Sequence, residues 1–170
     1  MRCTMTGRDF PDPFDGVWSD GEWVSWDYIN RQLHEQDRIA QFPHANQEII
    51  EVFDNLVDVA MDYKRVTGRY LPLFGELGEL YAEIKYGIRR HKPRAEGSDG
   101  KLGNDFVEVK TISPEKRAPK IRIKRSGNFN KVVVVKISAD FEFESRIIDR
   151  QALSKSFGKF ISTSWQLLDR

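Results

Sequence analysis

The stretch that most limits the fold is residues 131–137, KVVVVKI, in which four consecutive valines lie between two lysines. A strand with apolar side chains on both of its faces must be covered on both, as the strands of α/β sheets are. Residues 141–148 alternate apolar and polar side chains after a short Ser138-Ala139-Asp140 turn, so they are predicted to pair with it. We therefore predict an α/β fold in which helices flank a mixed β-sheet.

Residues 97–111, GSDGKLGNDFVEVKT, are predicted to form a β-hairpin that carries charge on its inner face. Gly103-Asn104 is the turn signal, because both residue types tolerate the positive φ that tight hairpin turns need. In the second arm side chains alternate between faces, so Phe106, Glu108 and Lys110 share one face. Two charged residues therefore lie on a face that should otherwise be buried, and such a conflict often marks a functional site.

Asp99, Glu108 and Lys110 together suit metal-assisted hydrolysis of a phosphodiester. Two close carboxylates repel each other unless a divalent cation lies between them, and hard oxygen ligands favour Mg²⁺. The ion acidifies a bound water, and a nearby lysine can orient that water or stabilise the developing negative charge. The alternative is a plain hairpin in which Glu108 and Lys110 form a solvated cross-strand pair.

The order of these motifs resembles that of the PD-(D/E)XK, or restriction-endonuclease-like, nuclease superfamily. Glu79, in the predicted helix LFGELGELYAEIKYGI at residues 73–88, matches the family's helix glutamate, Asp99 its metal-binding aspartate, and Glu108 and Lys110 its E-x-K pair. Ser98 stands where the family has proline, which leaves the aspartate open between Asp99 and Asp105. We favour Asp99, because Asp105 lies only three residues before Glu108 and on the opposite strand face.

The resemblance covers roughly residues 70–153 and implies a restriction-endonuclease-like core over residues 70–170. It implies that Asp99 and Glu108 bind Mg²⁺, for which Mn²⁺ may substitute. It also implies that Glu79 binds the metal or orients water, and that Lys110 positions the nucleophile or stabilises charge.

Residues 1–69 are predicted to be an extension, an irregular arm followed by helices, packed on this core. Ser25 and Asn46 are good N-caps for helices that run to about Ala40 and Thr67, and Gly68 closes the second. The second helix has a broad apolar face made of Ile49, Ile50, Phe53, Leu56, Val57, Ala60 and Met61. A double-strand cut needs two active sites or two binding events, and this face is a plausible two-fold contact, so we expect a homodimer.

Charge along the chain points to a polyanionic partner. Residues 1–84 carry 7 Lys and Arg against 16 Asp and Glu, whereas residues 85–136 carry 15 against 5. A basic band around the predicted site suits DNA, although the band could equally pair with the acidic N-terminal half. Within it, KIRIKR at residues 120–125 is predicted to bury Ile121 and Ile123 and to present Arg122, Lys124 and Arg125 to backbone phosphates.

We therefore expect a Mg²⁺-dependent deoxyribonuclease, with RNA not excluded as substrate. The alternatives are a catalytically inactive nucleic-acid-binding subunit of a larger complex and a non-nuclease interaction protein. No zinc finger or helix-turn-helix pattern is present, so sequence-specific cleavage would need a partner subunit or loops that the sequence does not identify.

Two further expectations concern location and the C-terminal region. The chain has neither a signal-peptide core nor an apolar run of about 18 residues, which predicts a cytoplasmic protein without membrane contact. Asp149 is predicted to cap a final helix that contains Leu153, Phe157 and Phe160, with Trp165, Leu167 and Leu168 packed on the core.

Overall fold

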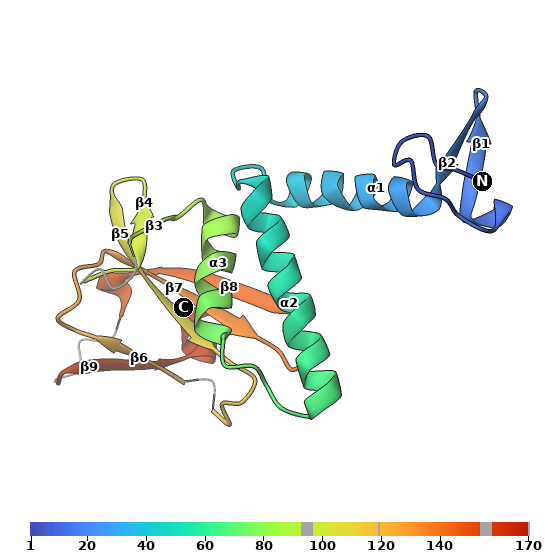
Figure 1. Cartoon of the computed structure of the whole chain (residues 1–170). Coiled ribbons are helices and arrows are strands. Elements are labelled where there is room, and N and C mark those ends of the chain that lie inside the picture. Colours follow the sequence, from blue (N-terminus) through green and yellow to red (C-terminus); the bar gives the residue numbers. More distant parts are fainter. Residues whose placement is uncertain (93–96, 119, 154–157, 170) are drawn as a thin grey trace. The chain divides into compact units, whose positions relative to one another are not determined.

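The computed structural model of the chain describes residues 1–92, 97–118, 120–153 and 158–169 (Figure 1). It divides into two compact units, Met1–Pro43 and His44–Arg170. Helix α2 (Gln47–Thr67), which the sequence analysis grouped with the N-terminal extension, thus belongs to the second unit and packs along α3 (Phe74–Tyr86). Within the described residues, no helix has the length and apolarity that crossing a membrane requires.

The first unit is a hairpin followed by a helix. A 3₁₀ turn (Pro13–Asp15) leads into strands β1 (Gly16–Ser19) and β2 (Glu22–Ser25), which pair antiparallel, so the prediction of an irregular arm is wrong for this segment. Trp23 packs edge-on against Phe10 and Trp18, which explains why rings are frequent here. Ser25 caps α1 (Trp26–Gln41) as predicted, because its Oγ accepts a hydrogen bond from the Tyr28 N–H at 3.4 Å.

The second unit is built on a five-stranded sheet in the order β3-β4-β5-β7-β8. Its strands are β3 (Arg89–Arg90), β4 (Gly100–Leu102), β5 (Asp105–Ile112), β7 (Lys131–Ile137) and β8 (Phe143–Asp149). β5 and β7 run parallel and the other pairs antiparallel, so the sheet is mixed as predicted. The four valines of β7, which lies between β5 and β8, are fully buried, and this confirms the interpretation of that run.

The two faces of the sheet have different covers. Helix α3 lies on one face, where Tyr81 donates a hydrogen bond to the Phe143 carbonyl of β8 at 3.2 Å. On the other face an apolar cluster joins the sheet to a separate pair of strands, β6 (Lys120–Lys124) and β9 (Phe160–Ser164). The buried members of this cluster are Ile112, Ile121, Ile123, Phe129, Val132, Val134, Leu153, Ile161 and Trp165. The prediction of a sheet flanked by helices is therefore confirmed for the face under α3, whereas this pair of strands covers the second face.

Local signals set the ends of the long helix. The Asn46 side chain accepts a hydrogen bond from the Glu48 N–H at 2.9 Å, and Gly68 ends the helix with a φ of 69°. Both follow the preferences for an asparagine N-cap and a glycine in the left-handed region.

The predicted C-terminal helix is not present. Arg150–Ala152 form a 3₁₀ turn, Asp149 makes no capping hydrogen bond, and Phe160 begins strand β9. Pairing with β6 explains the difference, because β6 needs a strand partner and Ile161 completes the apolar cluster beneath it. Trp165 is buried as expected and Leu168 packs partly on the cluster, but Leu167 is exposed. Phe157, which was assigned to the helix, lies outside the described residues.

Candidate functional site

The hairpin β4–β5 brings two of the predicted site residues, Asp99 and Glu108, close together. Its turn is formed by Gly103, with a φ of 60°, and Asn104, so that Leu102 pairs with Asp105. Asp99 lies directly before β4, and Glu108 lies in the middle of β5. The turn chemistry in the sequence therefore sets which residues of the two arms face each other.

Asp99 is held by hydrogen bonds on its backbone and its side chain. Its N–H donates to the Val107 carbonyl at 2.9 Å, and its carbonyl accepts from the His91 N–H at 2.9 Å. One carboxylate oxygen, Oδ2, accepts from the Val109 N–H at 2.6 Å. The side chain thus occupies the edge of β5 at the point where β4 begins, with its orientation fixed.

Glu108 and Lys110 form a close ion pair on the inner face of β5. The Lys110 Nζ lies 2.6 Å from Oε1 of Glu108, and the Glu108 side chain is only 15% exposed. Their cross-strand neighbours on β7 are Val132 and Val134, both fully buried. The pair therefore lies at the margin of the apolar cluster and is not the solvated surface pair of the alternative interpretation.

An open pocket of about 560 Å³ gathers several predicted residues. Asp99 and Glu108 form part of its wall, and Lys124 reaches it from the end of β6. The remaining lining comes from two loops, with the residues Gly97, Ser98, Ser126, Gly127 and Asn128. Two carboxylates and a lysine, from the residue before β4, from β5 and from the end of β6, thus line one open pocket.

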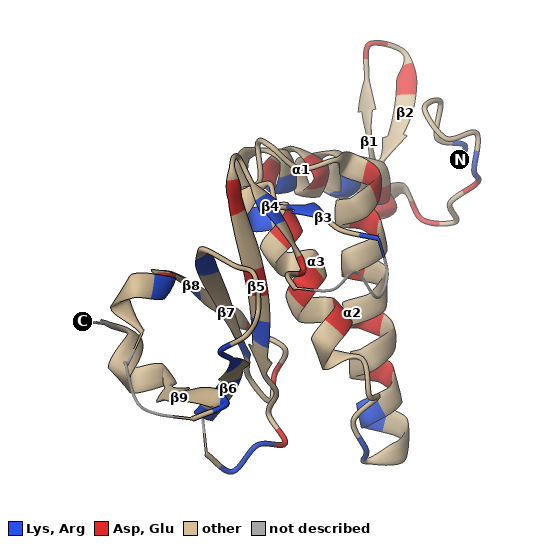
Figure 2. Cartoon of the chain, turned by 90° about the vertical axis from the view of Figure 1, so that its left-hand side faces the viewer, with Lys and Arg blue, Asp and Glu red and all other residues tan. Residues whose placement is uncertain are grey.

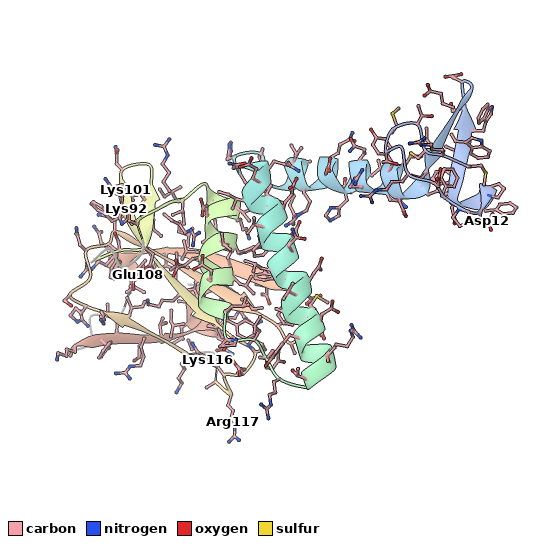
Figure 3. All side chains as sticks on the ribbon, in the orientation of Figure 1. Asp12, Lys92, Lys101, Glu108, Lys116 and Arg117 are labelled. Atoms are coloured by element: carbon pink, nitrogen blue, oxygen red, sulfur yellow. The ribbon has the colours of Figure 1, made fainter. Side chains whose placement is uncertain are left out.

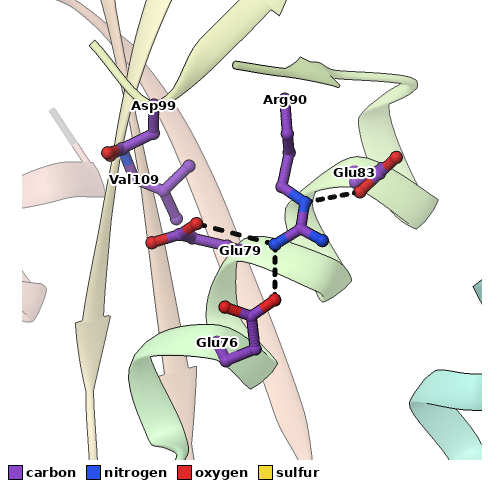
Figure 4. Close-up of polar contacts among 6 residues, drawn as sticks. All are labelled: Glu76, Glu79, Glu83, Arg90, Asp99 and Val109. Carbon is purple, nitrogen blue, oxygen red and sulfur yellow. Dashed lines mark hydrogen bonds and ion pairs between the residues drawn. The ribbon is translucent and has the colours of Figure 1, made fainter. Parts of the chain in front are cut away.

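Glu79 lies near these residues but belongs to a different set of contacts. It projects from α3 beside Val109, and the described lining of the pocket does not include it (Figure 4). Its Oε2 lies 3.7 Å from Nη1 of Arg90. The same nitrogen lies 2.6 Å from Glu76, and Nε of Arg90 lies 2.7 Å from Glu83. Arg90 therefore holds three glutamates of one helix edge.

Partial burial raises the pKa of Glu79, and repulsion from Asp99 and then from Glu76 raises it further. Arg90 and Lys110 act in the opposite direction but do not cancel the effect. A raised carboxyl pKa next to another carboxylate is the electrostatic pattern of many functional sites. Figure 4 shows Glu79 and Asp99 on either side of Val109, whose N–H donates to the Asp99 carboxylate.

The predicted phosphate-binding residues are separated by the structure. Basic residues lie along β6 in Figure 2, but Lys124 alone of the three named residues lines the pocket. Arg122 lies over the ring of Phe160 at 4.3 Å, and the Arg125 Nε donates to the Gly158 carbonyl at 3.0 Å. Arg122 and Arg125 thus also hold β6 against the segment that leads into β9.

Further basic side chains lie after β5. Figure 3 shows Lys116 and Arg117 projecting from the loop between β5 and β6, and Glu108 further within the same unit. Both basic residues are exposed.

Asp105 occupies a different place from Asp99. It begins β5 and lies in a second pocket, together with Lys131 and Asp149. Its carboxylate is 3.6 Å from the Lys131 Nζ, which is itself 2.6 Å from Asp149. Of the two aspartates, Asp99 is therefore the one that shares a pocket with Glu108.

Sequence reasoning missed the residue that shapes one wall of the pocket, Arg150. Its guanidinium donates to the Gly127 carbonyl at 2.6 Å and to the Phe129 carbonyl at 3.2 Å, and it lies 4.4 Å over the Phe129 ring. It also donates to the carbonyl of Arg125. No local signal identifies this role, because the carbonyls it binds lie more than twenty residues earlier in the chain.

The residues present fit a weakly held hard cation. Oδ1 of Asp99 and Oε2 of Glu108 have no hydrogen bond or ion pair with the described part of the chain. The described residues contain no group of three or more His, Cys, Asp or Glu side chains arranged to hold a metal ion. Mg²⁺ does not require one, because it keeps several waters and usually takes one or two carboxylates together with substrate phosphate.

Neither models of protein families nor curated protein sequences match this chain.

Proposed function

We propose that this chain is a Mg²⁺-dependent nuclease that hydrolyses phosphodiester bonds of DNA, a reaction that serves restriction, phage defence or DNA processing. The observation that carries the proposal is the shared pocket of Asp99, Glu108 and Lys124. Two carboxylates beside a lysine suit a site in which a cation and a phosphate bind together. The mixed sheet with α3 on one face agrees with the restriction-endonuclease-like arrangement that the motif order suggests.

Each side chain has a role in this proposal. Asp99 and Glu108 would hold Mg²⁺, or Mn²⁺ in its place, and the ion would supply an acidified water and a counter-charge for the phosphate. Lys110, paired with Glu108 at 2.6 Å, stabilises charge that develops on the reacting phosphate. Lys124 contacts a phosphate that does not react. Glu79 orients water or adds a ligand from the α3 side.

A second candidate is a nucleic-acid-binding subunit without turnover. The close Glu108–Lys110 contact favours it, because this lysine neutralises one of the two carboxylates that a cation would need. This candidate predicts salt-dependent DNA binding with no cleavage in Mg²⁺.

Cleavage of plasmid DNA in Mg²⁺ or Mn²⁺ distinguishes the two candidates. The wild-type chain should nick or cut the plasmid, and Asp99→Ala or Glu108→Ala should abolish cleavage while DNA binding is unchanged or tighter, because a repulsive carboxylate is gone. Asp105→Asn is the matched control and should keep most of the activity. An RNA substrate in parallel defines the nucleic acid, and full activity of the Asp99→Ala variant would overturn the site.

A further inference from the structure

Helix α2 carries two apolar stripes, and the rest of the second unit covers one of them. The covered stripe contains Ile50, Phe53 and Ala60, which are at most 4% exposed. Phe53 packs edge-on against Phe143 of β8, with ring centroids 5.0 Å apart. The single broad apolar face expected from the sequence is therefore divided, and only part of it belongs to the core.

The second stripe faces away from that core. Its three valines, Val52, Val59 and Val66, are 52%, 56% and 73% exposed. Valine is a poor helix former, so three exposed valines weaken the helix unless they pack against something. With their neighbours they form a stripe whose members lie alternately three and four residues apart: Ile49, Val52, Leu56, Val59, Tyr63 and Val66. We call this set the outer stripe.

The spacing of the outer stripe is that of a coiled-coil seam. Apolar residues at alternating steps of three and four keep one narrow face toward a second helix over several turns. Two antiparallel copies of α2 match along its whole length when they are centred between Val57 and Asp58. Leu56 then lies opposite the partner's Val59, Val52 opposite the partner's Tyr63, and Ile49 opposite the partner's Val66.

The charges of α2 favour a second copy in that orientation. Its first two turns carry Glu48 and Glu51 and no basic residue, a net charge of −2. Its last two turns carry Lys64 and Arg65 together with Asp62, which pairs with Arg65 at 2.9 Å, so their net charge is +1. Antiparallel pairing places the acidic end of each helix beside the basic end of the other, and it also opposes the two helix dipoles. Parallel pairing places acid beside acid and costs stability.

We propose that the outer stripe is a dimer contact in which α2 pairs antiparallel with α2 of a second copy of this chain. The inference is independent of the proposed nuclease activity, because it rests on the exposed residues of α2 alone. One helix pair is a small interface, so we expect an affinity in the micromolar range.

Sedimentation velocity of the full chain over a range of concentrations tests the contact. The wild-type chain should shift from monomer to dimer, whereas Val59→Glu should remain a monomer because it places a charge at the centre of the stripe in both copies. Met61→Glu is the matched control, since Met61 is a similarly exposed apolar residue of α2, at 45%, but lies outside the outer stripe. It should still dimerise. A wild-type chain that stays monomeric, or a Val59→Glu chain that dimerises as the control does, overturns the proposal.

Disulfide crosslinking tests the orientation. In a Cys3→Ser background, the double variant Ile49→Cys with Val66→Cys should oxidise to a covalent dimer, and neither single variant should. In the antiparallel pair two copies of residue 66 lie about 25 Å apart, from a rise of about 1.5 Å per residue. Efficient crosslinking by the Val66→Cys single variant would show parallel helices and overturn the assigned orientation. Circular dichroism of each variant checks that α2 is still folded.

Discussion

A methyl group added at Gly78 should push α3 away from the sheet. A β-carbon there would lie 2.0 Å from Oγ1 of Thr111 and 3.1 Å from its Cβ and Cγ2, because α3 crosses β5 at this point. Overpacking of this kind costs about 1–3 kcal/mol. Gly75 is in the same helix and its β-carbon would meet nothing within 4 Å, so Gly75→Ala should stabilise the chain by up to about 1 kcal/mol through helix propensity.

Guanidinium unfolding followed by far-ultraviolet circular dichroism measures both variants. We expect Gly78→Ala to lower the free energy of unfolding and Gly75→Ala to leave it unchanged or raise it. The cost of Gly78→Ala should shrink in a Thr111→Ala background, since the atom at 2.0 Å is then absent. Should Gly78→Ala stabilise the chain as much as Gly75→Ala does, α3 cannot lie this close to β5, and the approach of Glu79 to Asp99 would be wrong as well.

Three further predictions concern the site. Lys110→Ala should lower single-turnover cleavage by orders of magnitude with little loss of binding, whereas Lys124→Ala should weaken binding and reduce its salt dependence by about one unit; the reverse result would exchange their roles. Arg150→Ala should cost about 2 kcal/mol, measured by chemical unfolding, because hydrogen bonds from a charged group to the carbonyls of the pocket wall are lost; a neutral result would show that the wall does not depend on this residue. The raised pKa of Glu79 means that its contribution to stability is fully present below its unfolded pKa and is lost as pH rises through the folded value. Glu79→Gln should therefore be more stable than wild type at pH 7 and lose this advantage in acid. The side chain is 36% exposed, so the gain should stay below about 1 kcal/mol, and a variant that is less stable at pH 7 would contradict the assigned repulsion.

The sequence alone determined the features that depend on neighbouring residues. The caps at Ser25, Asn46 and Gly68 were predictable, because each depends on side-chain or backbone chemistry within one turn. The buried strand at residues 131–137 and the alternation of Ile121 and Ile123 with basic residues followed from strand periodicity in the same way.

Features that join distant parts of the chain were decided only by the tertiary structure. The segment around Phe160 was misassigned as helix because its strand partner, β6, lies far earlier in the sequence. Lys124 reaches the pocket of Asp99 and Glu108 through that same pairing, and Arg90 reaches Glu79 through the strand that follows α3. Whether an apolar position of α2 lies in the core or in the outer stripe likewise depends on where α3 packs. Local sequence sets backbone preference and periodicity. Which faces of the helices and strands pack together depends instead on closing long loops around a shared apolar core. No short segment of the sequence encodes this packing.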